Sequence, residues 1–124
     1  MHLLDYLNIE TTELSKEKVV LSMKIEEFHK QPYGILHGGM NGVLIETACS
    51  LGANEHLAEG SYAAGIDLQI NHLKSIVGGT LTVIATADRI GRSLQVWEGK
   101  IFNDNGELTA VGRCTLMNQK IKMY

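Results

Sequence analysis

The sequence predicts an α+β domain in which an antiparallel sheet wraps around one long buried helix. Residues from about 38 to 57 are apolar around most of a helix circumference, which is typical of a helix covered on all sides. Two strand-like segments precede this stretch and four follow it. No linker, repeat or low-complexity tract divides the 124 residues. We therefore expect a single domain over residues 1–124, because a helix that is apolar nearly all round must be enclosed by the sheet.

The first elements are short. Residues 3–7 suit a small helix, and the pattern becomes strand-like from Glu10, with a polar turn at 16–18. The next strand is indicated by apolar residues at alternate positions, Val19, Leu21, Met23 and Ile25. Pro32 and Gly34 then interrupt any regular structure, so residues 28–36 are expected to form a loop.

The expected central helix is unusual in its glycine content. Its apolar character comes from Val43, Leu44, Ile45, Ala48, Cys49, Leu51 and Ala53. Its four glycines, Gly38, Gly39, Gly42 and Gly52, each lower helix propensity by about 1 kcal/mol relative to alanine where they fall inside it. Such a helix depends on tertiary packing, and its glycines allow backbone or substrate to approach closely.

Strands are expected for the remainder of the chain. Alternating patterns cover residues 62–74, with Ile66, Leu68 and Ile70 on one face, and 80–89. Two further strands, 94–103 and 107–117, are separated by Asp104-Asn105-Gly106, a typical hairpin turn because Asn-Gly adopts positive φ at little cost.

Composition excludes several classes of function. A formal charge of −3 argues against a general nucleic-acid or anionic-membrane binder, which carries a basic surplus. No apolar run approaches the roughly 18 residues that span a bilayer, and the N-terminus resembles no secretory signal. Cys49 and Cys114 lack metal-ligand spacing. We expect a cytoplasmic protein with two reduced, buried thiols and no metal site.

Glu46 is the only charged side chain between His37 and Glu55. Burial of an unpaired carboxylate costs several kcal/mol, so glutamate at such a position has either a partner or a task. A structural ion pair across an oligomer interface would explain it. A catalytic carboxylate would explain it equally well.

The segment before the helix favours catalysis. Gln31 and His37 precede Gly38 and Gly39, where the first N–H groups of the helix lack internal partners and carry the positive end of its dipole. A carbonyl oxygen could approach these N–H groups as in an oxyanion hole. Glu46 lies about 12 Å further along an ideal helix than Gly38. A symmetric dimer with antiparallel helices would bring Glu46 of the partner subunit to this helix start.

These residues resemble a known family. Gln31, the run His37-Gly38-Gly39, Glu46 nine residues after the histidine, and Ser50 one turn later are similar to the acyl-CoA thioesterases of the PaaI and 4-hydroxybenzoyl-CoA group. The resemblance continues through residues 65–67, 71–75, 91–97 and 113–116, so it covers nearly the whole chain in order.

The resemblance implies a hotdog fold and hydrolysis of an acyl-CoA or aryl-CoA thioester without a cofactor. It implies a homodimer with shared active sites, and pairing of dimers into a homotetramer. Glu46 would be nucleophile or general base, and the Gly38 N–H would polarise the thioester carbonyl. His37 and Gln31 would position the thioester, and Ser50 would help to place the attacking water or the acyl group.

The same resemblance implies a set of substrate and CoA contacts. Cations and backbone N–H groups at strand ends can meet nucleotide phosphates, although without the resemblance they would be ordinary solvated charges. Gly65 would allow close approach of substrate or bend the sheet, and a plain β-bulge is the alternative. The expected contact residues are Gly65, His72, Leu73, Lys74, Ser75, Arg89, Ile90, Gly91, Arg92, Ser93 and Leu94.

Three other functions are consistent with the same fold. A dehydratase or hydratase would use a histidine and a carboxylate for proton transfer at carbon, but those enzymes space the two residues differently. A non-catalytic acyl-CoA-binding protein would keep the phosphate-contacting loops and lose the carboxylate, whereas Glu46 is present. A structural dimer would simply pair Glu46. Turnover that depends on Glu46 would separate the thioesterase from the last two.

Overall fold

The computed structural model describes residues 1–122. The elements follow the expected order: α1 (Leu3–Tyr6), β1 (Ile9–Leu14), β2 (Lys18–Lys24), the 3-10 helix η1 (Glu27–His29), α2 (Gly39–Asn54), β3 (Ser61–His72), β4 (Thr80–Ile90), β5 (Leu94–Phe102) and β6 (Leu108–Lys120). The number, type and sequence order of the main strands and of the long helix agree with the pattern in the sequence.

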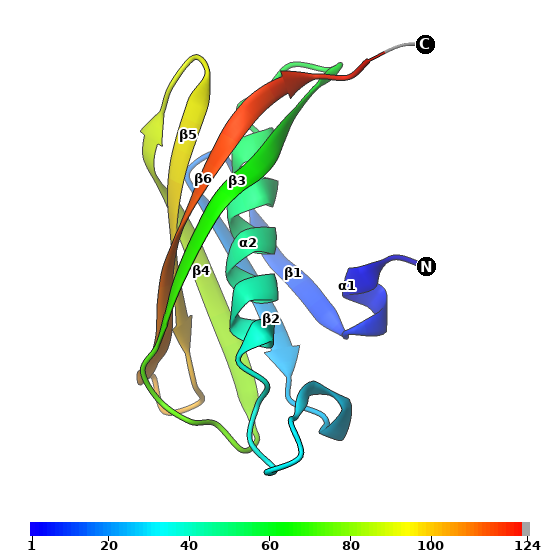
Figure 1. The fold of residues 1–124 in the computed structure, drawn as a ribbon, viewed down its shortest axis with the longest axis vertical. Coiled ribbons are helices and arrows are strands. Elements are labelled where there is room, and N and C mark those ends of the chain that lie inside the picture. Colours follow the sequence, from blue (N-terminus) through cyan, green and yellow to red (C-terminus); the bar gives the residue numbers. More distant parts are fainter. Residues whose placement is uncertain (123–124) are drawn as a thin grey trace.

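One six-stranded antiparallel sheet curves around α2 (Figure 1). The strand order is β1-β2-β4-β5-β6-β3, so β1 and β3 are the two edges. Every neighbouring pair of strands is antiparallel. The predicted α+β class, with the sheet wrapped around a single helix, is confirmed.

The core lies between α2 and the concave face of the sheet. Leu44 and Ile45 on the helix are fully buried, as are Trp97 and Leu116 on the strands. Ile45 lies so close to β5 that a Cβ on Gly99 would come within 2.9 Å of its Cγ2 atom. The absence of a side chain at this strand position lets the helix pack directly on the sheet.

Several boundaries differ from the prediction by one to three residues, among them the end of β3 at His72 rather than 74 and the end of β6 at Lys120 rather than 117. The central helix ends at Asn54 rather than near residue 57, because the chain continues in turns in which the His56 N–H donates to the Ala53 carbonyl. The loop predicted for 28–36 begins inside η1. His29 is buried there, with Nδ1 accepting from the Glu26 N–H at 2.9 Å and Nε2 lying 2.7 Å from the Leu7 carbonyl. The contact with Leu7 joins residues 22 positions apart, so it leaves no periodic signal in the sequence.

A β-bulge in β3 changes which of its residues lie on the same face of the sheet. The pairing with β6 passes from Gly65–Leu116 to Asp67–Thr115, so Ile66 is an additional residue in β3. Because each inserted residue reverses the alternation of a strand, Gly65 before the bulge faces α2 together with Leu68 after it. The prediction that Ile66 shares a face with Leu68 is therefore wrong, and the Ile66 side chain is 52% exposed.

Three further findings concern residues 1–122. No helix there has the length and hydropathy needed to cross a membrane. Cys49 and Cys114 are buried free thiols, as expected. No group of three or more histidine, cysteine, aspartate or glutamate side chains is arranged to hold a metal ion in this part of the chain.

Candidate active site

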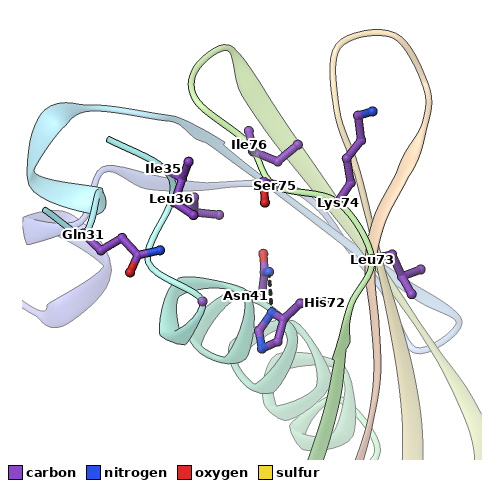
Figure 2. A pocket seen from close by; sticks show the side chains of 10 residues that line it. Gln31, Ile35, Leu36, Asn41, His72, Leu73, Lys74, Ser75 and Ile76 are labelled. Atoms are coloured by element: carbon purple, nitrogen blue, oxygen red, sulfur yellow. Dashed lines mark hydrogen bonds between the residues drawn. The ribbon is translucent and has the colours of Figure 1, made fainter. Parts of the chain in front are cut away.

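A cleft of about 290 Å³ opens at the amino end of α2. It lies between the loop before the helix, the first turn of the helix and the segment after β3 (Figure 2). Six of the predicted site residues line this cleft. Two of them come from residues 31–38 and four from residues 72–75, so the fold brings together segments more than 30 positions apart. The lining comprises Gln31, Ile35, Leu36, Gly38, Asn41, His72, Leu73, Lys74, Ser75 and Ile76.

The Gly38 N–H is available at this cleft. The Gly39 N–H donates to the Nδ1 atom of His37 at 2.9 Å. The next two N–H groups donate to the His37 and Gly38 carbonyls, from Met40 at 2.9 Å and from Asn41 at 3.0 Å. Within residues 1–122, the Gly38 N–H has no acceptor. It combines a free donor with the positive end of the helix dipole, and both favour an approaching oxygen atom.

His37 lies beside the cleft and caps the helix. Because its Nδ1 accepts from Gly39, the proton of the neutral imidazole is on Nε2. His37 itself does not line the cleft wall, although Gln31 does. The Gln31 backbone is held in a turn, with its N–H donating to the Ile35 carbonyl at 2.9 Å.

His72, at the end of β3, closes the other side of the helix start. A Cβ on Gly38 would lie only 3.2 Å from the His72 Cε1 atom, so glycine permits this close contact. The His72 Nδ1 atom is 3.0 Å from the Asn41 Nδ2 atom. An amide NH₂ group only donates, so His72 accepts at Nδ1 and carries its proton on Nε2.

Asn41 is a cleft residue that the sequence reasoning missed. It is buried, with 6% of its surface exposed, and it lies on the first turn of α2. The signal for it was the same as for Glu46, a polar side chain within an apolar helix. Uncharged amides are common enough in helices that this signal was weak.

Glu46 lies away from this cleft, against β3. A Cβ on Gly65 would come 2.6 Å from the Glu46 Oε2 atom and 3.7 Å from the Cys114 sulfur. Glycine at position 65 therefore makes room for the carboxylate, and the β-bulge follows directly after it. The β-bulge named as the alternative for Gly65 is present, and the group that approaches Gly65 closely is the Glu46 carboxylate, so a contact with substrate stays a prediction. Ser50 lies one turn beyond Glu46 and is half-buried.

Burial and nearby negative charges raise the pKa values of the two thiols. Burial raises the pKa of Cys114 to about 11, and the negative charges of Glu46 and then Asp67 add to the effect. Burial also raises the pKa of Cys49 far above its usual value. Both thiols are therefore neutral at pH 7, and they are poor nucleophiles.

Lys74 and Ser75 lie on the segment that follows β3. The Lys74 ammonium is 3.5 Å from the Glu107 carboxylate, and both side chains are about half exposed. A hydrogen bond from Asn103, followed by the charge of Lys74, lowers the pKa of Glu107. An exposed pair of this kind is weak, so Lys74 can exchange Glu107 for a phosphate.

The predicted run Arg89–Leu94 covers the end of β4, the β4–β5 turn at residues 91–93 and the start of β5, and this turn lies at the opposite end of α2 (Figure 1). The Asn118 side chain donates to the Gly91 and Arg92 carbonyls at 3.2 and 3.0 Å, and its backbone N–H donates to the Ser93 carbonyl at 2.9 Å. Three successive carbonyls thus point inward. The N–H groups of Arg92 and Ser93 have no acceptor in the described part of the chain, an arrangement that suits an anion.

The predicted site residues therefore form two groups. Gln31, Gly38 and His72–Ser75 meet at the amino end of α2, with His37 beside them. The second group lies further along, with Glu46 and Ser50 on the helix, Gly65 on β3 beside Glu46, and Arg89–Leu94 near the carboxyl end of the helix. Eight residues of helix separate Gly38 from Glu46, which is about 12 Å at 1.5 Å per residue. One chain does not unite the two groups.

Comparisons with known proteins agree with one another. Residues 33–110 match the family model of the thioesterase superfamily. The chain is 38% identical to a 1,4-dihydroxy-2-naphthoyl-CoA hydrolase of Listeria monocytogenes, over 97% of this chain and 98% of that protein. It superposes on a thioesterase of Haemophilus influenzae with a TM-score of 0.92 and 32% identity, covering 98% of this chain and 85% of the other. A hypothetical protein of Staphylococcus aureus gives a TM-score of 0.94 at 35% identity, covering 97% and 100%.

Proposed function

The chain belongs to the thioesterase superfamily and is a thioester hydrolase, and from this premise we propose that it hydrolyses an acyl-CoA or aryl-CoA thioester to the free acid and CoA. The hotdog fold implied by the sequence resemblance is confirmed by the matching thioesterase structures. The CoA hydrolase among its relatives, similar over nearly their entire lengths, supports a CoA thioester as substrate.

The observation that carries the proposal is the division of the site along α2. The free Gly38 N–H lies at one end, and the Glu46 carboxylate lies against β3 further along. A two-fold axis near the middle of β3 would make the helices of two subunits antiparallel. Gly38 of one subunit would then approach Glu46 of the partner subunit.

The sheet offers an edge for such a dimer. β3 has 12 residues and pairs with β6 on one side only. An open edge of this length presents unpaired N–H and C=O groups that can pair with another strand. We therefore propose a homodimer joined through β3. The pairing of two dimers into a homotetramer stays a prediction from the resemblance.

The chemistry follows from these placements. The thioester carbonyl oxygen would accept from the Gly38 N–H, and a donor of this kind stabilises the transition state by about 2.7–4 kcal/mol. Glu46 of the partner subunit would attack the carbonyl carbon, or remove a proton from a water that attacks it. The C–S bond breaks, the electron pair leaves on the CoA sulfur, and the thiolate takes up a proton. If Glu46 itself attacks, the acyl group is left on its carboxylate as an anhydride, which water then hydrolyses to the free acid and the regenerated carboxylate. His37 and Gln31 would orient the thioester, and Ser50 would orient the water or acyl group.

The cations can serve the nucleotide end of CoA. Lys74 lies at the cleft of one subunit. Arg89, Arg92 and the free N–H groups of the β4–β5 turn lie at the far end of α2, so the antiparallel dimer would bring them toward the partner's cleft. Phosphate oxygens suit both kinds of donor. No metal or other cofactor enters this scheme, because a thioester is already an activated acyl group.

Release of CoA from a panel of aryl and aliphatic thioesters tests the proposal. Glu46→Gln keeps the side-chain shape and removes the carboxylate, so we expect turnover to fall about 10³-fold. Glu55→Gln, an exposed position just beyond the same helix, is the matched control and should retain wild-type turnover. Hydrolysis that survives in Glu46→Gln would contradict the role of Glu46.

Subunit mixing tests the shared site. Glu46→Gln and His37→Ala homodimers should both be nearly inactive. Random re-association makes half of the dimers mixed, and each mixed dimer has one intact site, so activity should return to roughly a quarter of wild type. If Glu46 served its own chain, mixing would restore nothing.

A further inference from the structure

Asn41 carries a buried acceptor that no donor within residues 1–122 uses. Its Oδ1 atom is buried and has no hydrogen-bond partner in the part of the chain that the structure describes. The Nδ2 atom of the same side chain is engaged by the His72 Nδ1 at 3.0 Å. A buried carbonyl oxygen without a donor costs about 1–3 kcal/mol, so native proteins rarely retain one without a use.

The surroundings of Asn41 make this acceptor part of the cleft. Figure 2 shows the side chain rising from α2 into the space between His72 and Ser75. The neighbouring walls include Leu36 and Ile76, which are 7% and 8% exposed. These apolar side chains cannot donate a hydrogen bond to the Asn41 Oδ1, whereas a ligand bound in the cleft could do so.

The position of Asn41 relative to Gly38 indicates which ligand group would reach it. Residues three apart lie on the same face of a helix, about 5–6 Å apart at Cβ. If the thioester oxygen is bound by the Gly38 N–H, a group a short distance along the thiol arm would lie beside Asn41. In a CoA thioester, the first amide nitrogen of that arm lies two methylene groups beyond the sulfur, and its N–H is a donor.

We propose that Asn41 is a substrate-binding residue whose Oδ1 accepts a hydrogen bond from the first amide N–H of the thiol arm. This inference rests on the proposed thioesterase function. The same side chain holds His72 through Nδ2, so one amide fixes the imidazole and recognises the substrate. The site thereby selects thioesters of amide-bearing thiols over thioesters of plain thiols.

Two synthetic thioesters with the same acyl group isolate this contact. In one the thiol is N-acetylcysteamine, and in the other it is the O-acetyl ester of mercaptoethanol, in which an oxygen replaces the N–H. For the wild type we expect kcat/KM to be about tenfold higher with the amide, the effect of one neutral hydrogen bond. Uncatalysed hydrolysis of each compound is measured and subtracted.

Variants assign the preference to Asn41. Asn41→Leu should hydrolyse the two compounds at equal kcat/KM within about twofold, because the acceptor is gone. Asn41→Ser, whose hydroxyl is too short to reach the same point, should behave likewise and serves if the leucine variant does not fold. Asn41→Asp keeps an acceptor and should keep the preference. Asn54→Ala removes an amide at the other end of α2 and should keep the wild-type ratio.

The outcomes separate the two proposals. If the wild type hydrolyses neither compound nor any CoA thioester, the proposed function fails. If it hydrolyses both compounds with equal kcat/KM, water satisfies Asn41 and the inference about Asn41 is wrong while the function stands. A tenfold preference that persists in Asn41→Leu would place the amide contact elsewhere, and it would also overturn the inference.

Discussion

Gln95 and Asn41 are both buried amides beside α2, but they lie at opposite ends of the helix and differ in their partners. The Gln95 Nε2 atom donates to the Ala53 carbonyl at 3.1 Å and to the Asn118 Oδ1 at 3.0 Å, and its Oε1 accepts from the Trp97 indole at 2.9 Å. Asn41 has one partner at Nδ2 and none at Oδ1 within residues 1–122.

Gly52 and Gly42, which lie toward opposite ends of α2, differ in how tightly they are packed. At the carboxyl end, Gly52 packs so tightly on Trp97 that a Cβ would lie 2.5 Å from the ring. At the amino end, a Cβ on Gly42 would meet only the Leu68 side chain, at 3.7 Å. Around Gln95 and Gly52 the carboxyl end is tightly packed and its buried side-chain polar groups are paired, whereas in residues 1–122 the amino end keeps the free Gly38 N–H, the unpaired Asn41 Oδ1 and a cleft. The unpaired groups and the open space at the amino end suit a bound ligand.

Alanine at the two glycines provides the largest test of this contrast. Gly52→Ala should lower the free energy of unfolding by about 3 kcal/mol, because the methyl group overlaps the fully buried Trp97. Gly42→Ala should raise it by up to about 1 kcal/mol, because alanine favours the helix and the space is adequate. Urea unfolding of both variants measures the pair. Equal changes in the free energy of unfolding of the two variants would contradict the difference in packing around Gly52 and Gly42.

Gly65→Ala changes the surroundings of Glu46, which lies between the two ends of α2. The added methyl group would lie 2.6 Å from the Glu46 Oε2, so the carboxylate must move. Displacement of a reacting group by about 1 Å costs on the order of 100-fold in rate, so kcat should fall by that amount. Gly78→Ala, where a Cβ meets nothing within 4 Å, is the control and should leave kcat unchanged. A fully active Gly65→Ala would remove Glu46 from the proposed mechanism.

Leucine at the two amides sharpens the comparison of polar groups. Gln95→Leu leaves the Trp97 N–H and the Asn118 Oδ1 without a hydrogen-bond partner, so we expect a loss of about 2 kcal/mol in unfolding free energy. Asn41→Leu leaves only the His72 Nδ1 without its partner and removes an acceptor that was already unpaired. The free energy of unfolding should therefore change by no more than about 1 kcal/mol. Denaturation midpoints with unchanged m-values would establish the difference.

The smallest effect concerns Glu107, which forms the exposed pair with Lys74. Its pKa in the folded protein lies below the ordinary value of 4.5, so its contribution to stability is fully present above pH 4.5 and is lost as pH falls through the lower pKa of the folded state. Glu107→Gln should therefore lower the Tm slightly at pH 7 and not at all in strong acid. A difference that grew as the pH fell would contradict this sign.

The sequence alone was enough to identify the fold class and the principal catalytic candidate. An apolar stretch without a polar face predicts an enclosed helix, and alternating strands on both sides of it predict the sheet. Glu46 could be found because it is the one charge in that stretch, and Gly38 because the glycines mark the start of the helix. These are local signals, and local composition is what residue patterns record.

Tertiary structure decided the arrangement of the site. The contact of Asn41 with His72 joins residues 31 positions apart, and Asn118 holds a turn 26 or 27 positions away. The bulge at Ile66, which reverses the expected face of β3, depends on pairing with β6. The placement of His72–Ser75 at one end of α2 and of the β4–β5 turn at the other depends on how the sheet curves around the helix. Such contacts are set by packing between distant segments, which have no common period in the sequence.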